Sequence, residues 1–142
     1  MSGIGTVKSL NDLMHERYQN PIEVTRGTVT IVGGTAGTTV GTSTIFVTGE
    51  LLRATFITPD MQDSDSTNMQ LVDELDINVF ESGTQAESGT HTFAKGGTNL
   101  GGGGGTLDRN KVWLWGTTDV VMTAEGTQSA SRNFPYLLLT QR

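Results

Sequence analysis

The chain contains no cysteine, which excludes disulfide bonds, thiolate-ligated zinc and thiol nucleophiles. It also has no long apolar run that could span a bilayer, because its apolar stretches are only a few residues long. The first residues are polar and broken by charges, so they do not form a secretory signal sequence. We therefore expect a protein that is made and used without crossing a membrane and that has no membrane partner.

Basic residues are few and scattered. The nine Lys and Arg residues are spread from Lys8 to Arg142 against fifteen Asp and Glu residues, which gives a net charge of −6. Aromatic residues do not alternate with them to form stacking platforms for bases. Since phosphate binding depends on clustered cations, the sequence predicts no nucleic-acid partner.

Glycine and threonine dominate the composition instead. The 142 residues, about the size of one domain, include 19 glycines, and threonine is commoner still. Threonine favours strands and glycine favours turns, and about seven or eight short strand-like runs follow one another without alternating helices. The predicted fold is all-β, an antiparallel β-sandwich or jelly-roll-like single domain.

The first 23 residues differ from the rest. Apolar residues recur there at helical spacing, and Pro21 ends the pattern. We expect an N-terminal arm with a short helix over residues 1–23 and a β-sandwich domain over residues 24–142. Because a short helix is marginal alone, this one needs a surface to pack on. Its candidate partner contacts are Leu10, Met14 and Tyr18.

Alternation of apolar and polar residues predicts which side chains face the core. Val29 and Ile31 form one inward pair, and residues 43–58 read as two strands or as one strand bent around residues 48–50, with Leu52, Ala54 and Phe56 on one face. The clearest alternation places three further side chains on the core side of a half-buried strand. These are Leu75, Ile77 and Val79.

Titratable residues form no recognisable catalytic pattern. The two histidines, His15 and His91, are far apart, and we expect both to be solvated. The acidic group Asp60, Asp63 and Asp65 lacks the order of a calcium-binding loop, so a solvated acidic loop is favoured over a metal site.

The remaining candidates for chemistry are equally weak. Glu74, Asp76 and Glu81 alternate along the predicted strand and would line its wet face, which does not suit a paired-carboxylate hydrolase. The glycine-rich segments 33–42 and 99–106 lack the ending of a nucleotide-binding loop, and no serine has the context of a nucleophile elbow. We predict a non-enzymatic protein with no catalytic residues, cofactor or metal.

Trp113 and Trp115 are the residues most suggestive of binding. Two positions apart on a strand, they point to the same face, with Val112 and Leu114 on the other. If Val112 and Leu114 face the core, the tryptophans form an exposed contact surface for protein or carbohydrate. In the alternative arrangement they are buried beneath an arm or helix. Both arrangements suit a protein that assembles.

Three segments carry a family resemblance. The Gly-Glu-Leu-Leu strand within residues 49–59, the strand rich in Asp, Ile and Val within residues 71–80 and, more loosely, residues 112–139 resemble the small β-sandwich virion proteins of tailed bacteriophages. Residues 1–23 and the five glycines at 101–105 lie outside the resemblance. It implies a capsid decoration or cement protein that binds the outside of the major capsid protein shell, made in the host cytoplasm, located in the virion and forming a homo-oligomer such as a trimer.

Two other functions stay open. In a carbohydrate-binding module, Trp113, Trp115 and Tyr136 would stack on sugar rings. In a tail or head–tail connector component, the chain would assemble into a ring elsewhere in the particle. A flat, coplanar aromatic platform favours sugar binding, whereas aromatic side chains covered by a neighbouring subunit favour assembly.

Overall fold

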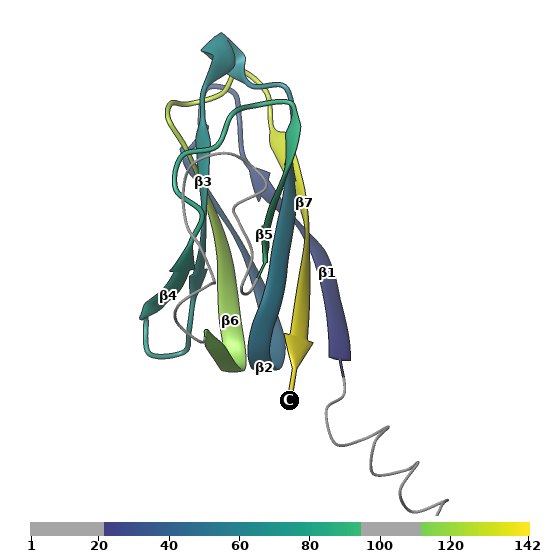
Figure 1. The fold of residues 1–142 in the computed structure, drawn as a ribbon. Coiled ribbons are helices and arrows are strands. Elements are labelled where there is room, and N and C mark those ends of the chain that lie inside the picture. Colours follow the sequence, from purple (N-terminus) through teal and green to yellow (C-terminus); the bar gives the residue numbers. More distant parts are fainter. Residues whose placement is uncertain (1–21, 95–111) are drawn as a thin grey trace, which may run out of the picture.

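The computed structural model describes residues 22–94 and 112–142, and this part of the chain is all-β (Figure 1). A short 3-10 turn, Gln62–Ser64, is the single helical element in these ranges, and no described helix could cross a membrane. The seven strands are β1 (Ile22–Ile31), β2 (Val40–Thr58), β3 (Thr67–Val72), β4 (Asn78–Glu81), β5 (Gly89–Ala94), β6 (Trp113–Ala124) and β7 (Arg132–Gln141).

All the strand pairs are antiparallel, as the sequence predicts. The sheet order is β1-β7-β2-β6-β3-β4, and β5 pairs with β2. The first half of β2 pairs with β6, whereas its second half pairs with β7 along one edge and with β5 along the other. β2 therefore runs through the whole domain and pairs with β5, β6 and β7.

β2 is one bent strand of 19 residues and not two strands. Gly49 has a φ of 126°, which is a backbone conformation that side-chain-bearing residues rarely adopt. The register with β7 then shifts between Leu51 and Arg53, as in a β-bulge. The half-buried Leu52 lies at this shift, so Ala54 and Phe56 are buried as predicted while Leu52 is not fully inside.

The bend folds the sheet back on itself. The start of β2 lies so close to the end of β1 that a Cβ at Gly41 would clash with the Thr30 carbonyl. Further along, the Ser43 hydroxyl reaches the Tyr136 hydroxyl of β7 at 2.9 Å. The enclosed face forms one hydrophobic core, an arrangement consistent with the predicted β-sandwich. The core consists mainly of Val29, Ile31, Val47, Leu51, Ala54, Phe56, Met69, Leu71, Phe80, Phe93, Leu114, Val120, Met122, Phe134, Tyr136 and Leu138.

The prediction that Leu75 and Ile77 face the core is wrong. Their exposed fractions are 78% and 53%, and both lie in the turn between β3 and β4. The Asp73 carboxylate accepts hydrogen bonds from the backbone N–H groups of Leu75 and Ile77, at 2.9 and 3.0 Å, which stabilises the reversal of the chain. The strand begins only at Asn78, and Phe80 is its buried residue.

The predicted N-terminal helix lies outside the described residues, and so do its candidate contacts Leu10, Met14 and Tyr18 together with His15. β1 begins at Ile22, two residues before the predicted start of the β domain. The five-glycine segment is also outside the described ranges. The arm and its helix therefore remain predictions.

Candidate functional site

The two tryptophans of β6 lie on the outer face of the sheet. Trp113 and Trp115 are 40% and 65% exposed, whereas Leu114 between them is fully buried. Their rings are stacked, with centroids 5.9 Å apart and planes inclined by 17°. The two indole planes are therefore nearly parallel, and both rings lie on the same outer face.

Phe46 of β2 extends this exposed apolar area. It is 76% exposed and pairs with Thr117 of β6, next to the pair formed by Thr48 and Trp115. Diagonal neighbours on one face of an antiparallel pair are within reach of aromatic side chains. We call Phe46, Trp113 and Trp115 the aromatic surface. Sequence reasoning missed Phe46, although its alternation with the buried Val47 is a usable signal.

The turn between β3 and β4 is fastened beside the aromatic surface. The Glu74 carboxylate accepts a hydrogen bond from the Thr117 backbone N–H at 3.0 Å. Gly116, with a φ of 80°, leaves room for this carboxylate, because a Cβ there would clash with Glu74 and would lie 3.6 Å from the Phe46 ring. The exposed Leu75 therefore lies on a turn that is held by hydrogen bonds within the turn and by one hydrogen bond to β6.

This turn also corrects the predicted placement of two carboxylates. Glu74 and Asp76 do not alternate along a strand but lie in the turn, where Asp76 has a φ of 60°. Glu81 is in β4 and accepts a hydrogen bond from the Asn68 side chain at 2.6 Å. The side of the aromatic surface next to the turn therefore carries exposed carboxylates and no described cation.

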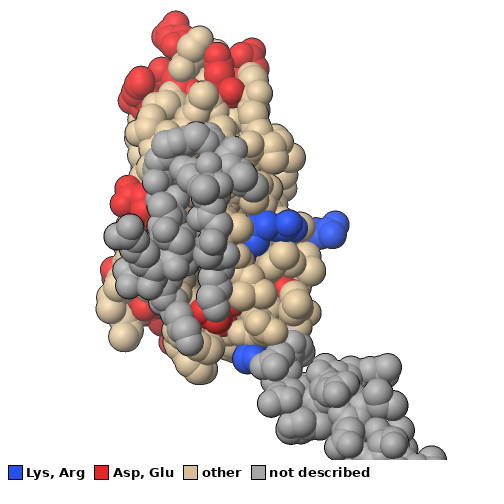
Figure 2. All heavy atoms as spheres, viewed as in Figure 1, with Lys and Arg blue, Asp and Glu red and all other residues tan. Residues whose placement is uncertain are grey.

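Cationic side chains are found elsewhere. Those in the described ranges are Arg26, Arg53, Arg132 and Arg142, and Figure 2 shows how little of the visible surface is basic and how much red gathers at one end. Arg142 pairs with Glu23. Arg26 and Arg53 are exposed, and their side chains make no ion pair or hydrogen bond with the residues that the structure describes.

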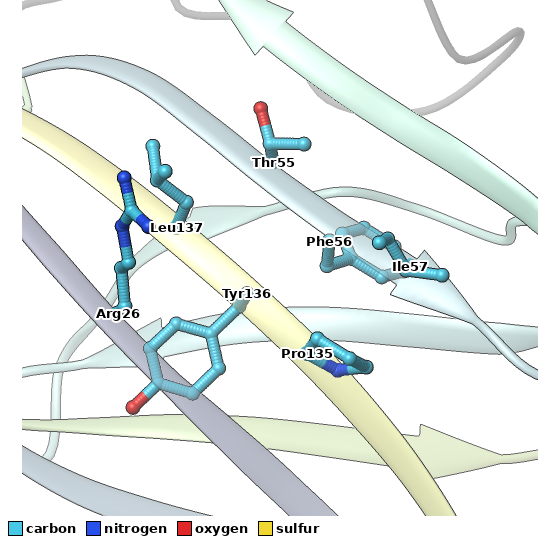
Figure 3. Close-up of a pocket in the computed structure, with 7 residues that line it drawn as sticks. All are labelled: Arg26, Thr55, Phe56, Ile57, Pro135, Tyr136 and Leu137. Carbon is cyan, nitrogen blue, oxygen red and sulfur yellow. The ribbon is translucent and has the colours of Figure 1, made fainter.

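Arg26 lies at the side of a shallow apolar hollow of about 320 Å³ (Figure 3). The register places Arg26 of β1, Leu137 of β7 and Thr55 of β2 side by side across three strands. Pro135 and Ile57 line the end of the hollow away from the Arg26 guanidinium. We call this concavity the Arg26 hollow. Its lining offers one guanidinium and no carboxylate.

The prediction that His91 is solvated is wrong. Its side chain is almost fully buried on β5, with the Nε2 atom 3.2 Å from the Thr58 hydroxyl and 2.9 Å from the Ala86 carbonyl. The imidazole also packs against the Phe56 ring at a centroid distance of 5.1 Å. These contacts give His91 a structural role at the end of β2.

The predicted acidic loop makes bonds to the protein. Asp65 accepts a hydrogen bond from the Gln128 side chain at 2.9 Å, and Gln128 in turn accepts one from the Gln62 backbone N–H at 2.7 Å. No group of three His, Cys, Asp or Glu residues in the described ranges is placed to hold a metal ion. The contacts of Asp65 join two loops at one end of the domain.

Tyr136 does not belong to an aromatic platform. It is buried, and its hydroxyl points to Ser43 in the interior. The suggestion that Tyr136 stacks on sugar together with the tryptophans is therefore wrong.

Comparisons with known proteins define no family. No protein-family model and no curated protein matches the chain. Among solved structures, an agarase is similar with 11% identity and a TM-score of 0.36 over 87% of this chain and 22% of the agarase, so the chain spans about a fifth of that enzyme. The mitogen of Yersinia pseudotuberculosis is similar with 14% identity and a TM-score of 0.30, over 84% of this chain and 85% of the mitogen. Similarity at this level defines neither a family nor an activity.

Proposed function

We propose that this protein is a non-enzymatic assembly protein that binds a protein partner through its aromatic surface. The observation that carries the proposal is the exposure of Trp115 and Phe46 on neighbouring, paired strands. Large exposed apolar patches on folded domains mark contact sites. Tryptophan is also enriched among the residues that contribute most to protein–protein binding.

The aromatic surface is suited to binding because the strands and the turn that carry it are already ordered in the isolated domain. Trp113 and Trp115 are on a paired strand with Leu114 locked in the core, and the hydrogen bond from Thr117 to Glu74 fastens the adjoining turn. Fully burying one large apolar side chain contributes about 1.5–3 kcal/mol. Aromatic side chains with few rotatable bonds lose little conformational entropy when they dock, which lowers one of the costs of association.

The family resemblance supports a particular partner. It implies a capsid decoration or cement protein with a β-sandwich or jelly-roll fold, which binds the major capsid protein on the outside of a virion. Because many copies bind to one shell, their total binding is strong even where each contact is weak. A tail or head–tail connector protein of the same particle would use the same kind of surface.

Carbohydrate binding is the alternative that two neighbouring exposed tryptophans favour. A sugar ring stacks on a free aromatic face. Here Trp113 and Trp115 are the exposed rings, and Tyr136 is buried. The burial of Tyr136 removes one of the three rings of the sugar platform and supports a protein partner over an extended sugar platform.

The test uses phage heads that lack this chain. Purified protein is added to them, and binding is read by cryo-electron microscopy. We expect regular density at symmetry-related sites with the wild type and its loss with Trp113→Ala/Trp115→Ala. The control is Val32→Ala, which changes an exposed apolar residue in the loop after β1. Circular dichroism verifies that each variant is folded.

Two results would contradict the proposal. Undiminished density with the double tryptophan variant would exclude the aromatic surface as the contact. No density with well-folded wild-type protein would exclude decoration, and a glycan array together with binding to purified tails would then separate the two alternatives.

A further inference from the structure

We infer that the aromatic surface of one copy docks in the Arg26 hollow of a second copy, so that copies of this chain associate head to tail. The inference rests on the proposed function, because it names a partner for the same aromatic surface. It is carried by the complementary shape, polarity and charge of the two regions.

The aromatic surface projects from the sheet, and the Arg26 hollow is a recess that could receive such a projection. Trp115 is 65% exposed and Phe46 is 76% exposed, so both side chains stand out from the sheet. The Arg26 hollow, with a volume of about 320 Å³, is open and its lining is mainly apolar. Aromatic side chains that fill such recesses are typical anchors of protein interfaces.

The charges correspond as well. Arg26 and Arg53 are on the outer face around the hollow and have no ionic partner among the described residues. The exposed carboxylates of Glu74 and Asp76 are on the turn beside the aromatic surface. A guanidinium stacks favourably over an indole face and pairs with a carboxylate nearby.

This local complementarity matters because the chain as a whole is acidic. With a net charge of −6, two copies repel each other at long range, so they associate only where opposite charges meet. The hollow provides such a place, since its lining contains a guanidinium and no carboxylate.

The bend of β2 separates the two regions within one copy. The aromatic surface is on β6 and the first half of β2, whereas the hollow is on β1, β7 and the second half of β2. Because the sheet folds at Gly49, one copy cannot cover its own hollow with its own aromatic surface. A contact between unlike surfaces leaves each copy with one free surface, which leads to a ring or an open chain.

The test is complementation between two variants. Trp115→Ala disables the aromatic surface and keeps the hollow, whereas Arg26→Glu disables the hollow and keeps the aromatic surface. We expect wild-type protein to increase in mass with concentration in size-exclusion chromatography with light scattering. Each variant alone should be a monomer, and an equimolar mixture of the two should form a 1:1 dimer and nothing larger. Val32→Ala should behave as the wild type.

The outcomes separate this inference from the proposed function. A wild type that stays monomeric at about 1 mM, the range of the weakest specific contacts, overturns the inference. A mixture of folded variants that does not form the dimer also overturns it. If Trp115→Ala loses binding to phage heads while self-association is unchanged, the proposed function stands and the inference fails. If self-association follows the expected pattern and no head binding occurs, the aromatic surface binds a second copy as inferred, and the phage head is excluded as its partner.

Discussion

The hydroxyl oxygens of Ser43 and Tyr136 lie 2.9 Å apart and join the first half of β2 to β7 across the inside of the folded sheet. Gly27 makes the contact possible, because a Cβ there would clash with the Tyr136 hydroxyl. The contact links strand segments that do not pair with each other, because Ser43 pairs with Val120 of β6 and Tyr136 with Phe56 in the second half of β2. It therefore reports directly on how the sheet closes.

Replacing Tyr136 by Phe should leave the Ser43 hydroxyl without its partner. Because Ser43 is only half-buried, we expect the free energy of unfolding to fall by about 0.5–1.5 kcal/mol, the net contribution of a typical hydrogen bond. Urea denaturation monitored by fluorescence measures the change. Adding Ser43→Ala should restore part of the loss, because both partners are then absent. Purely additive effects of the two substitutions would mean that the hydrogen bond contributes nothing.

Leu75 and Leu71 provide a matched test of the corrected strand. Leu75→Asp changes an exposed turn residue, so we expect a change in stability within about 0.5 kcal/mol. Leu71→Asp places an unpaired charge in the core and should unfold the domain. Circular dichroism and thermal melting compare the two. A strongly destabilised Leu75→Asp would restore the original assignment of this residue to the core.

Deletion of residues 1–20 tests the predicted arm. Since β1 begins at Ile22, the deletion removes no residue of the described sheet, and we expect the melting temperature to change little. Binding to phage heads should weaken if the arm contacts the shell. A large fall in the melting temperature of the isolated protein would show that the arm is part of the domain's own fold.

Glu87 should make the stability of the protein depend on pH in the acidic range. Its carboxylate accepts a hydrogen bond from the Met61 backbone N–H at 2.6 Å, and chiefly this bond lowers the pKa of Glu87 below its usual value of 4.5. A lowered pKa in the folded state means that the stabilisation is complete above the unfolded pKa and is lost as the pH falls through the folded pKa. Wild-type protein should therefore lose more stability than Glu87→Gln between neutral and acidic pH in urea titrations. Parallel pH profiles of the two proteins would exclude this linkage.

Local alternation of side chains accounts for the parts of the fold that were predicted from sequence. Val29 and Ile31, Ala54 and Phe56 are buried as expected, because side chains on a strand alternate between faces wherever the strand is regular. The same rule places Trp113 and Trp115 on one shared face, and the burial of Leu114 shows that this face is the outer one. The rule failed at Leu75, where the hydrogen bonds of Asp73 turn the chain while the apolar pattern continues.

The sequence by itself determined the fold class and that the two tryptophans share one face of a strand, since composition and alternation act between residues that are close along the chain. Only the tertiary structure decided that Phe46, Trp115 and the turn carrying Glu74 meet at one surface. It also decided that His91 is buried and that Arg26 lies beside an apolar hollow. These relationships depend on pairing between strands that are far apart in the sequence, and on the bend at Gly49 that folds the sheet over its core.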